Sequence, residues 1–162
     1  MAMAAHLIQA YGDWMAEMRG VAEAPRWSAP DLSALPGPYA PPGGVLLLAR
    51  GRDGSGLGCA AMRAFDDRPH LYTGLIKRLY VVPEARGQGH GRRLAAALIE
   101  TGRAAGFARL LLSTLPEMPE AQALYGALGF REIPPYTSAL IPGRIAMALE
   151  LRPDADGRAE AG

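Results

Sequence analysis

Residues 79–93 constrain the fold of this chain more than any other stretch. An apolar, β-branched run ends at Pro83, glycines follow at alternate positions (Gly87, Gly89 and Gly91), and an alanine- and leucine-rich helical pattern begins directly after them. The pattern predicts a strand, a glycine loop and the start of a helix. Because glycine has no Cβ atom, successive backbone N–H groups can approach one anion at the positive end of the helix dipole. We therefore expect this loop to bind phosphate.

Length and charge limit the domain count and the class of partner. A chain of 162 residues is long enough for one domain with its own core, which we expect to span residues 1–151. Residues 152–162 carry no apolar anchor, so we expect a disordered tail there. Lys+Arg 17 against Asp+Glu 16 leaves a formal charge of +1, too little to draw the whole molecule onto nucleic acid or an anionic membrane.

Cysteine usage and hydropathy indicate the compartment. Cys59 is the single cysteine, which excludes an internal disulfide and suits a reducing environment, where we expect it to be a buried, inert thiol. No apolar run reaches the ~18–20 residues that a membrane span needs, and the first residues lack the basic region of a signal peptide. The sequence thus predicts a soluble, cytoplasmic protein without a membrane partner.

Apolar periodicity predicts the other elements. Helices are expected over residues 4–18, 92–105 and 118–128, with a short one after residue 28, and Gly106 and Gly129 are expected to end the two later helices. Strands are expected over 45–49, 57–65, 74–82, 109–113, 130–133 and 145–151, with side chains alternating along 74–82, and residues 36–44 read as a loop. This order predicts an α/β (α+β) protein with a mixed sheet, antiparallel in its first half, and one right-handed strand–helix–strand crossover.

The glycine loop by itself does not decide which phosphate-bearing ligand it binds. A nucleoside triphosphate, a dinucleotide and coenzyme A all present phosphates, and a purely structural turn is a further alternative. The first two are disfavoured, because Arg92 and Arg93 stand where a Walker loop needs Lys and Ser/Thr, and because the spacing of Gly87, Gly89 and Gly91 misses the pattern G-x-G-x-x-G.

Two segments carry a family resemblance. Residues 79–91, Leu-Tyr-Val-Val-Pro-Glu-Ala-Arg-Gly-Gln-Gly-His-Gly, resemble the R/Q-x-x-G-x-G/A segment of the GNAT superfamily of acetyl-CoA-dependent N-acetyltransferases together with its preceding strand. Residues 121–130, Ala-Gln-Ala-Leu-Tyr-Gly-Ala-Leu-Gly-Phe, resemble the second signature, A-x-x-L-Y-x-x-x-G-F. The resemblance implies a central, mostly antiparallel twisted sheet with a splayed strand pair, flanked by about four helices. The start of the chain leaves almost no room for the strand that usually opens this fold.

The resemblance also assigns roles to residues. It implies that the backbone of Leu79, Tyr80 and Val81 pairs with the pantetheine arm of acetyl-CoA, and that the amide of Val81 or Val82 polarises the thioester carbonyl. It implies a proton donor, Tyr125, for the departing coenzyme A thiolate. The coenzyme pyrophosphate is expected on the residues of the glycine loop: Arg86, Gly87, Gln88, Gly89, His90, Gly91 and Arg92. No metal is implied, and the side chain of His90 is expected to be solvated.

Two positions depart from the family pattern. Met118 stands where many members have an asparagine that contacts the coenzyme, and a thioether cannot replace the amide's donor and acceptor. Residues 74–82 contain no Asp or Glu, so the usual strand carboxylate that would deprotonate the amine is missing. The base is therefore unassigned. The alternatives are a water chain, an acceptor amine of low pKa that needs no dedicated base, or one of four weak candidates: His70, Tyr72, Glu84 and Tyr136.

The sequence thus predicts an enzyme that transfers an acetyl group directly from acetyl-CoA to a primary amine, without a covalent intermediate. The acceptor, a small molecule or a protein amine, is expected to be chosen by the first helices and by residues 134–142. A non-catalytic acyl-CoA sensor and a nucleotide-binding regulatory domain are the rival hypotheses. Family members are often homodimers, and a homodimer is compatible with this sequence.

Overall fold

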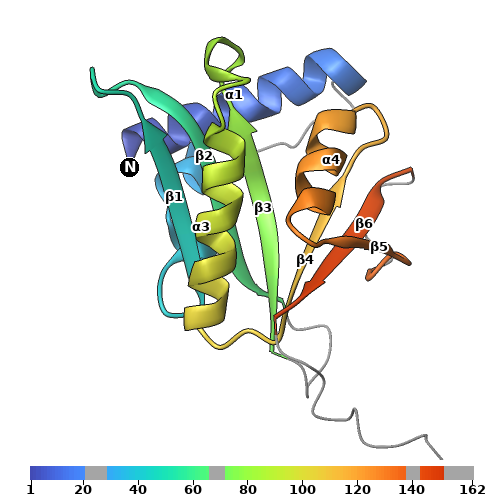
Figure 1. Ribbon diagram of the computed structural model, residues 1–162. Coiled ribbons are helices and arrows are strands. Elements are labelled where there is room, and N and C mark those ends of the chain that lie inside the picture. Colours follow the sequence, from blue (N-terminus) through green and yellow to red (C-terminus); the bar gives the residue numbers. More distant parts are fainter. Residues whose placement is uncertain (21–28, 66–71, 138–142, 152–162) are drawn as a thin grey trace, which may run out of the picture. The chain divides into compact units, whose positions relative to one another are not determined.

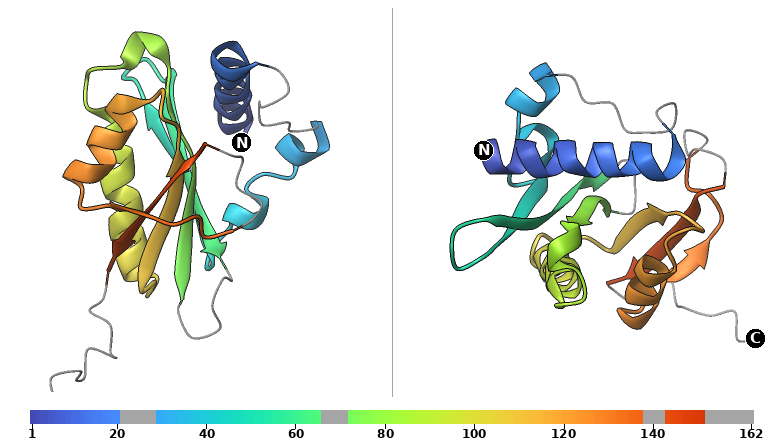
Figure 2. Two further views of the ribbon diagram at one scale, coloured as in Figure 1. Left: turned by 90° about the vertical axis from the view of Figure 1, so that its right-hand side faces the viewer. Right: turned by 90° about the horizontal axis from the view of Figure 1, so that it is seen from above.

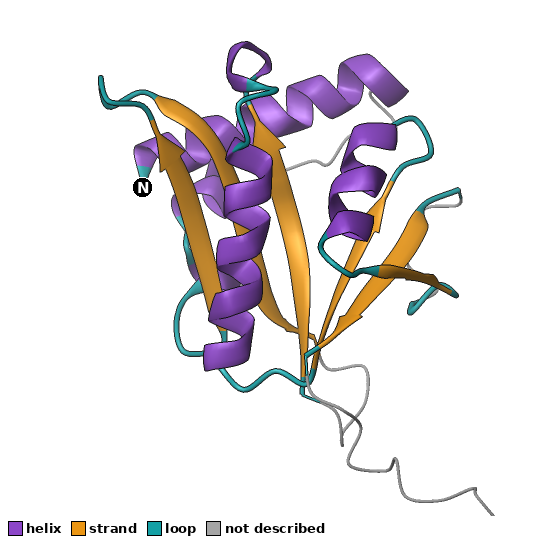
Figure 3. Cartoon of the chain, in the orientation of Figure 1, coloured by secondary structure: helices purple, strands orange, loops and turns teal. Residues whose placement is uncertain are grey.

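The computed structural model describes residues 1–20, 29–65, 72–137 and 143–151. The elements follow the predicted order, with α3 beginning at His90 rather than at Arg92 (Figures 1 and 3). Gly106 (φ +85°) and Gly129 (φ +99°) follow α3 and α4 in the left-handed conformation typical of helix ends, as predicted. The bounds are α1 Ala2–Arg19, α2 Ala29–Ser33, η1 Gly37–Tyr39, β1 Gly44–Arg50, β2 Gly56–Phe65, β3 Thr73–Val81, η2 Pro83–Ala85, α3 His90–Ala104, β4 Arg109–Thr114, α4 Pro119–Ala127, β5 Arg131–Ile133 and β6 Ile145–Glu150.

The strands form a six-stranded sheet in the order β1-β2-β3-β4-β6-β5. Strand β1 pairs antiparallel with β2, and β6 pairs antiparallel with both β4 and β5. Strands β3 and β4 are parallel, with Thr73 opposite Arg109, and α3 connects them. The predicted mixed α/β class, mostly antiparallel with one crossover, is therefore confirmed.

By its contacts the chain divides into two compact units. The first comprises residues 1–64 and 76–101, and the second comprises residues 65–75 and 102–162. The first therefore holds α1, α2, the β1–β2 hairpin, the later half of β3 and most of α3. The second holds the beginning of β3 and the elements β4, α4, β5 and β6.

The first unit is built around the apolar stripe of α1. Leu7 and Ile8 are fully buried against Cys59 and Tyr80, and α1 and α3 cover opposite faces of this part of the sheet (Figure 2). Each such aliphatic side chain contributes roughly 1.5–3 kcal/mol by leaving water. The prediction of a buried cysteine is confirmed, and burial raises the pKa of the Cys59 thiol to about 12.

The proline-rich segment before β1 is more ordered than the predicted loop. It contains the 3-10 turn η1, and Tyr39 at its end is buried. A Cβ atom on Gly44 would lie 2.6 Å from the carbonyl oxygen of Pro38, which shows how closely the turn lies on the start of β1. Only glycine permits this approach.

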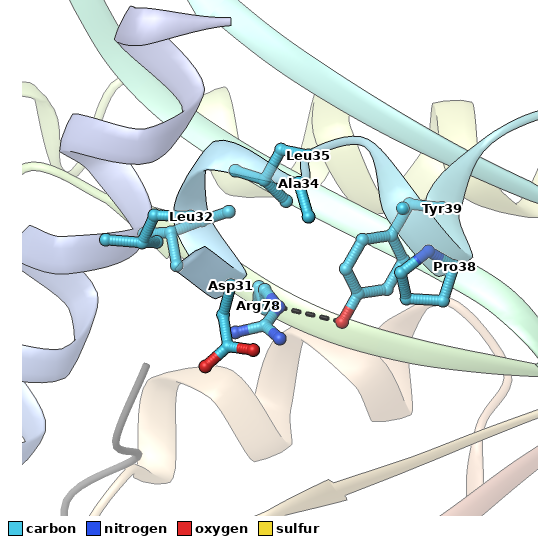
Figure 4. Close-up of a pocket in the computed structure, with 9 residues that line it drawn as sticks. Asp31, Leu32, Ala34, Leu35, Pro38, Tyr39 and Arg78 are labelled. Carbon is cyan, nitrogen blue, oxygen red and sulfur yellow. Dashed lines mark hydrogen bonds between the residues drawn. The ribbon is translucent and has the colours of Figure 1, made fainter. Parts of the chain in front are cut away.

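Strand β3 contains one residue with an unusual backbone conformation, Arg78. This residue has a φ of +59°, the left-handed region that a long, unbranched side chain rarely occupies. Beyond it, Tyr80 and Val82 pack on the α1 side, in the cluster of Leu7 and Ile8. Arg78 lines a cavity beside Ile8 of the same helix (Figure 4), so Arg78, Tyr80 and Val82 share one side of the strand, as the predicted alternation requires.

The second unit has its own apolar cluster. Leu75, Leu111 and Ala148, from three neighbouring strands, are buried together, and Phe65, Ile133 and Tyr136 pack against them. Buried Arg109 directs its Nε toward Thr73 Oγ1 at 3.4 Å. Among the described residues no helix is both long enough and apolar enough to span a membrane.

Candidate coenzyme-binding site

The glycine loop between β3 and α3 has open space at two of its glycines. Gly87 (φ +74°) and Gly89 (φ +81°) both lie in the left-handed region, and a Cβ atom added to either would meet nothing within 4 Å. Directly after them begins α3, a helix of 15 residues whose first N–H groups and dipole favour an anion. The loop therefore combines exposed residues, a left-handed backbone that glycine adopts without strain, and free space directly before a helix.

Arg86 lies against the aromatic side chains of the first unit. Its Nε donates to the carbonyl oxygen of Val81 at 3.0 Å. Its Cζ lies 4.8 Å from the ring centroid of Trp14 and 5.8 Å from that of Tyr80. A guanidinium over aromatic faces gains cation–π attraction, so Arg86 ties the end of β3 to helix α1. Its side chain thus braces the loop.

Side chains of the loop also hold its own backbone. Arg93 Nη2 donates to the carbonyl oxygen of Gln88 at 3.3 Å and lies 3.0 Å from Nδ1 of His90. Gln88 Nε2 donates to the carbonyl oxygen of Glu84 at 3.4 Å. His90 is half-buried and its contact with Arg93 lies at the surface, and Arg92 is exposed. Arg93, in the first turn of α3, therefore lies beside the loop.

The two candidate amides at the end of β3 differ in direction. The N–H of Val82 donates to the carbonyl oxygen of Leu57 on β2 at 3.0 Å, so it belongs to the sheet ladder. Since successive residues of a strand direct their N–H groups to opposite edges, the N–H of Val81 points away from β2. The ring of Tyr80 packs against Tyr11 and Trp14, and desolvation raises the pKa of its phenol.

Tyr125 lies in the second unit, on α4. Its side chain is buried, with only 6% exposed, and its ring meets Phe130 edge-on at 5.7 Å between centroids. The Phe130 N–H donates to the carbonyl oxygen of Tyr125 at 3.0 Å, which closes the end of the helix. Tyr125 therefore packs against another residue of its own signature segment, Phe130.

Met118 occupies the N-cap of α4 and makes no side-chain capping bond. The turn before the helix is held by Gln122, whose Nε2 donates to the carbonyl oxygens of Leu115 at 3.0 Å and Pro116 at 3.3 Å. The sequence offered no reason to select Gln122. It stands at an unspecified (x) position of the second signature, and nothing local in the sequence indicates that its side chain bonds to the preceding turn.

Residues 21–130 match the family model described as the acetyltransferase (GNAT) family. This chain belongs to the GNAT family. An uncharacterized N-acetyltransferase of Schizosaccharomyces pombe is 37% identical over 113 residues, which are 70% of this chain and 68% of that protein. The enzyme class is therefore N-acetyltransferase, as predicted.

Solved structures share the GNAT fold. A putative acyl-CoA N-acyltransferase from Klebsiella pneumoniae superposes with a TM-score of 0.67 at 26% identity, covering 91% of this chain and 88% of that one. A GNAT phosphinothricin acetyltransferase from Sinorhizobium meliloti, solved in complex with AcCoA, gives a TM-score of 0.68 at 24% identity, covering 90% and 84%. The second likeness concerns the fold alone.

The weak candidates for the GNAT base occupy packing or surface positions. Tyr72, 48% exposed, stacks on Phe107 at 4.3 Å between ring centroids. Tyr136 meets Phe65 edge-on at 5.5 Å. Glu84 is exposed in η2, and His70 lies outside the described residues. Within the described part of the chain, no group of three or more His, Cys, Asp or Glu is placed to hold a metal ion.

Proposed function

We propose that this GNAT protein uses acetyl-CoA as its donor and transfers the acetyl group directly to a primary amine. The observation that carries the proposal is the loop at Gly87 and Gly89, where left-handed backbone and open space meet the N-terminus of α3. The pyrophosphate is assigned to the amides of residues 87–92, where charge-assisted hydrogen bonds and the helix dipole favour it. The AcCoA complex of the Sinorhizobium GNAT neighbour supports this donor.

The pantetheine arm is assigned to the end of β3, along the edge that faces away from β2. An amide-bearing arm can pair with Leu79, Tyr80 and Val81 as an added strand does. Because the Val82 N–H is used by Leu57, we assign the polarising N–H to Val81. Arg86 Nε donates to the carbonyl oxygen of the same residue, in the next peptide group, and so restrains the backbone beside this N–H.

The reaction needs no covalent enzyme intermediate. The neutral amine attacks the thioester carbonyl, the tetrahedral adduct expels the coenzyme A thiolate, and the amine loses its extra proton. A phenol of pKa near 10 is protonated at neutral pH and can donate to a thiolate whose conjugate acid has a pKa near 8.5. We assign this donation to Tyr125.

Two measurements test the proposal. Calorimetric titration with acetyl-CoA and coenzyme A is expected to show binding, and its absence up to millimolar ligand would refute the assignment of the donor. Thiol release across a panel of amines is expected to show turnover. Binding without turnover on any amine would favour a non-catalytic acyl-CoA sensor, and protection by ATP or NAD alone would favour a nucleotide-binding domain.

A further inference from the structure

Two buried polar groups of the second unit lie close together in the strand register, where β4 ends and β6 begins. Among the described residues of this unit, the buried side-chain atoms without a hydrogen-bond partner are Thr114 Oγ1 and Arg144 Nε. Thr114 is the last residue of β4 and pairs with Ile145, the first residue of β6, which Arg144 directly precedes. A buried polar group without a partner is costly, so each one in a folded protein calls for a structural or functional reason.

Arg144 is held by a neutral partner. Its Nη1 donates to Ser113 Oγ at 2.9 Å, and no carboxylate of the described residues pairs with its guanidinium. The side chain is half-buried: Nε is enclosed, whereas Nη2 is neither bonded to the described residues nor enclosed, so it faces solvent. A partly buried cation that has no counter-charge within the described part of the chain favours an incoming anion.

The Ser113 hydroxyl adds a second donor at the same place. Its oxygen accepts from Arg144, and within the described part of the chain its side chain makes no further bond, so its own hydrogen remains to be donated. A guanidinium has no acceptor, and an ionised carboxylate has no donor. A hydroxyl hydrogen beside the outer N–H groups of an arginine therefore matches the two oxygens of a carboxylate.

Both donors lie on the face of β4 and β6 opposite α4. Helix α4 covers one face of these strands (Figures 1 and 2), and a Cβ atom on Gly129, directly after α4, would lie 3.2 Å from Leu149 Cδ1. Leu149 therefore points to the α4 face. Because side chains alternate along a strand, Ala148 and Arg144 point to the other face, and the bond from Arg144 places Ser113 there too.

Strand β4 has a paired neighbour on one side only at this point. The pairing of β3 with β4 joins Thr73–Leu75 to Arg109–Leu111, whereas the pairing of β4 with β6 continues to Thr114. In the described part of the chain, residues 112–114 thus have β6 as their sole ladder partner. A ligand can approach Ser113 along this edge.

We propose that Ser113 and Arg144 bind the carboxylate of the acceptor, so that the enzyme acetylates an amine that also carries a carboxyl group. The inference rests on the proposed acetyl transfer. There, the coenzyme phosphates are assigned to the glycine loop and the leaving thiolate to Tyr125 of α4, so the face opposite α4 is left for the acceptor. The single positive charge of Arg144 matches a carboxylate better than a phosphate dianion.

A binding measurement tests the site without turnover. In the ¹H–¹⁵N NMR spectrum, the Arg144 Nε–H signal is assigned by its loss in Arg144→Gln. The protein amino acids, β-alanine and the carboxamide of each are then titrated into the wild-type protein. We expect at least one acid to shift this signal and its carboxamide to bind about 10- to 150-fold more weakly, the effect of one charge-assisted hydrogen bond. Equal binding of acid and amide, or no shift with any acid, would overturn the proposal.

Kinetics provide the second readout. In Arg144→Gln the kcat/KM ratio of acid to amide is expected to fall to about one, while the Kd for acetyl-CoA stays within about twofold. Arg131→Gln, on the exposed part of β5, is the matched control and should keep the wild-type ratio. A large loss of acetyl-CoA affinity in Arg144→Gln would assign Arg144 to a coenzyme phosphate and overturn the proposal, as would faster turnover of O-phosphoethanolamine than of every carboxylate.

A third variant covers a folding failure of Arg144→Gln. Ser113→Ala removes the hydroxyl that holds Nη1, so a several-fold loss of the acid preference is expected, and an unchanged preference counts against the proposal. Failure of the donor assignment is separable. Absence of acetyl-CoA binding would refute that assignment alone, because the shift of the Arg144 signal is measured without coenzyme.

Discussion

Replacing Gly89 with alanine, beside a control at Gly54, distinguishes two effects. One is the loss of folding stability caused by backbone strain, and the other is the loss of coenzyme affinity caused by blocking the phosphate site. Gly89 has a φ of +81°, and its added Cβ would meet nothing within 4 Å. Gly54, in the turn of the β1–β2 hairpin, has nearly the same geometry, with a φ of +83° and nothing within 4 Å. It is therefore a matched control in the same unit.

The expected magnitudes follow from this match. An L-residue in the left-handed region costs about 1–2 kcal/mol, so Gly89→Ala and Gly54→Ala should lower the free energy of unfolding by similar amounts. Only at Gly89 would the methyl group enter space that we assign to the pyrophosphate. Losing one charge-assisted hydrogen bond there costs about 1.5–3 kcal/mol, which corresponds to a roughly 10- to 150-fold rise in the Kd for acetyl-CoA.

Urea denaturation and calorimetric titration of both variants measure the two quantities. We expect equal losses of stability and a weaker Kd for Gly89→Ala alone. If the Kd for acetyl-CoA changes equally in the two variants, the open space at Gly89 is not a phosphate site, and the loop has only a structural role.

Three further outcomes are expected. Tyr125→Phe should lower kcat while the Kd for acetyl-CoA stays within about twofold; a parallel loss of both would make the tyrosine structural. In Gly58→Ala, the new Cβ would lie 2.6 Å from the Tyr80 carbonyl oxygen, so urea denaturation should show a loss of about 1–3 kcal/mol, and an unchanged midpoint would contradict the packing. Burial raises the Cys59 pKa to about 12, so ionisation of the thiol in the unfolded chain should reduce stability as pH rises from about 9 to 12, and Cys59→Ala, measured alongside, should lack this part of the slope.

Much of the fold was predictable because it depends on local patterns. The apolar stripe of α1, the run before Pro83 and the glycines after the last two helices each specify one element through its own periodicity or turn chemistry. The predicted order of helices and strands was confirmed for this reason. The two motifs identified the family because they are continuous in sequence.

What the sequence by itself determined is therefore the set of elements, the glycine loop and the family. Tertiary structure decided where side chains point: Arg86 turns to Trp14, the Val82 amide joins β2, and Arg78 takes a left-handed conformation at a cavity lined by the first helices. Those outcomes depend on contacts between residues far apart in the chain, such as Arg78 with Tyr39, which no local pattern encodes. Gly54 and Gly89 have nearly the same φ and equally open space at Cβ, but only Gly89 directly precedes a helix, α3.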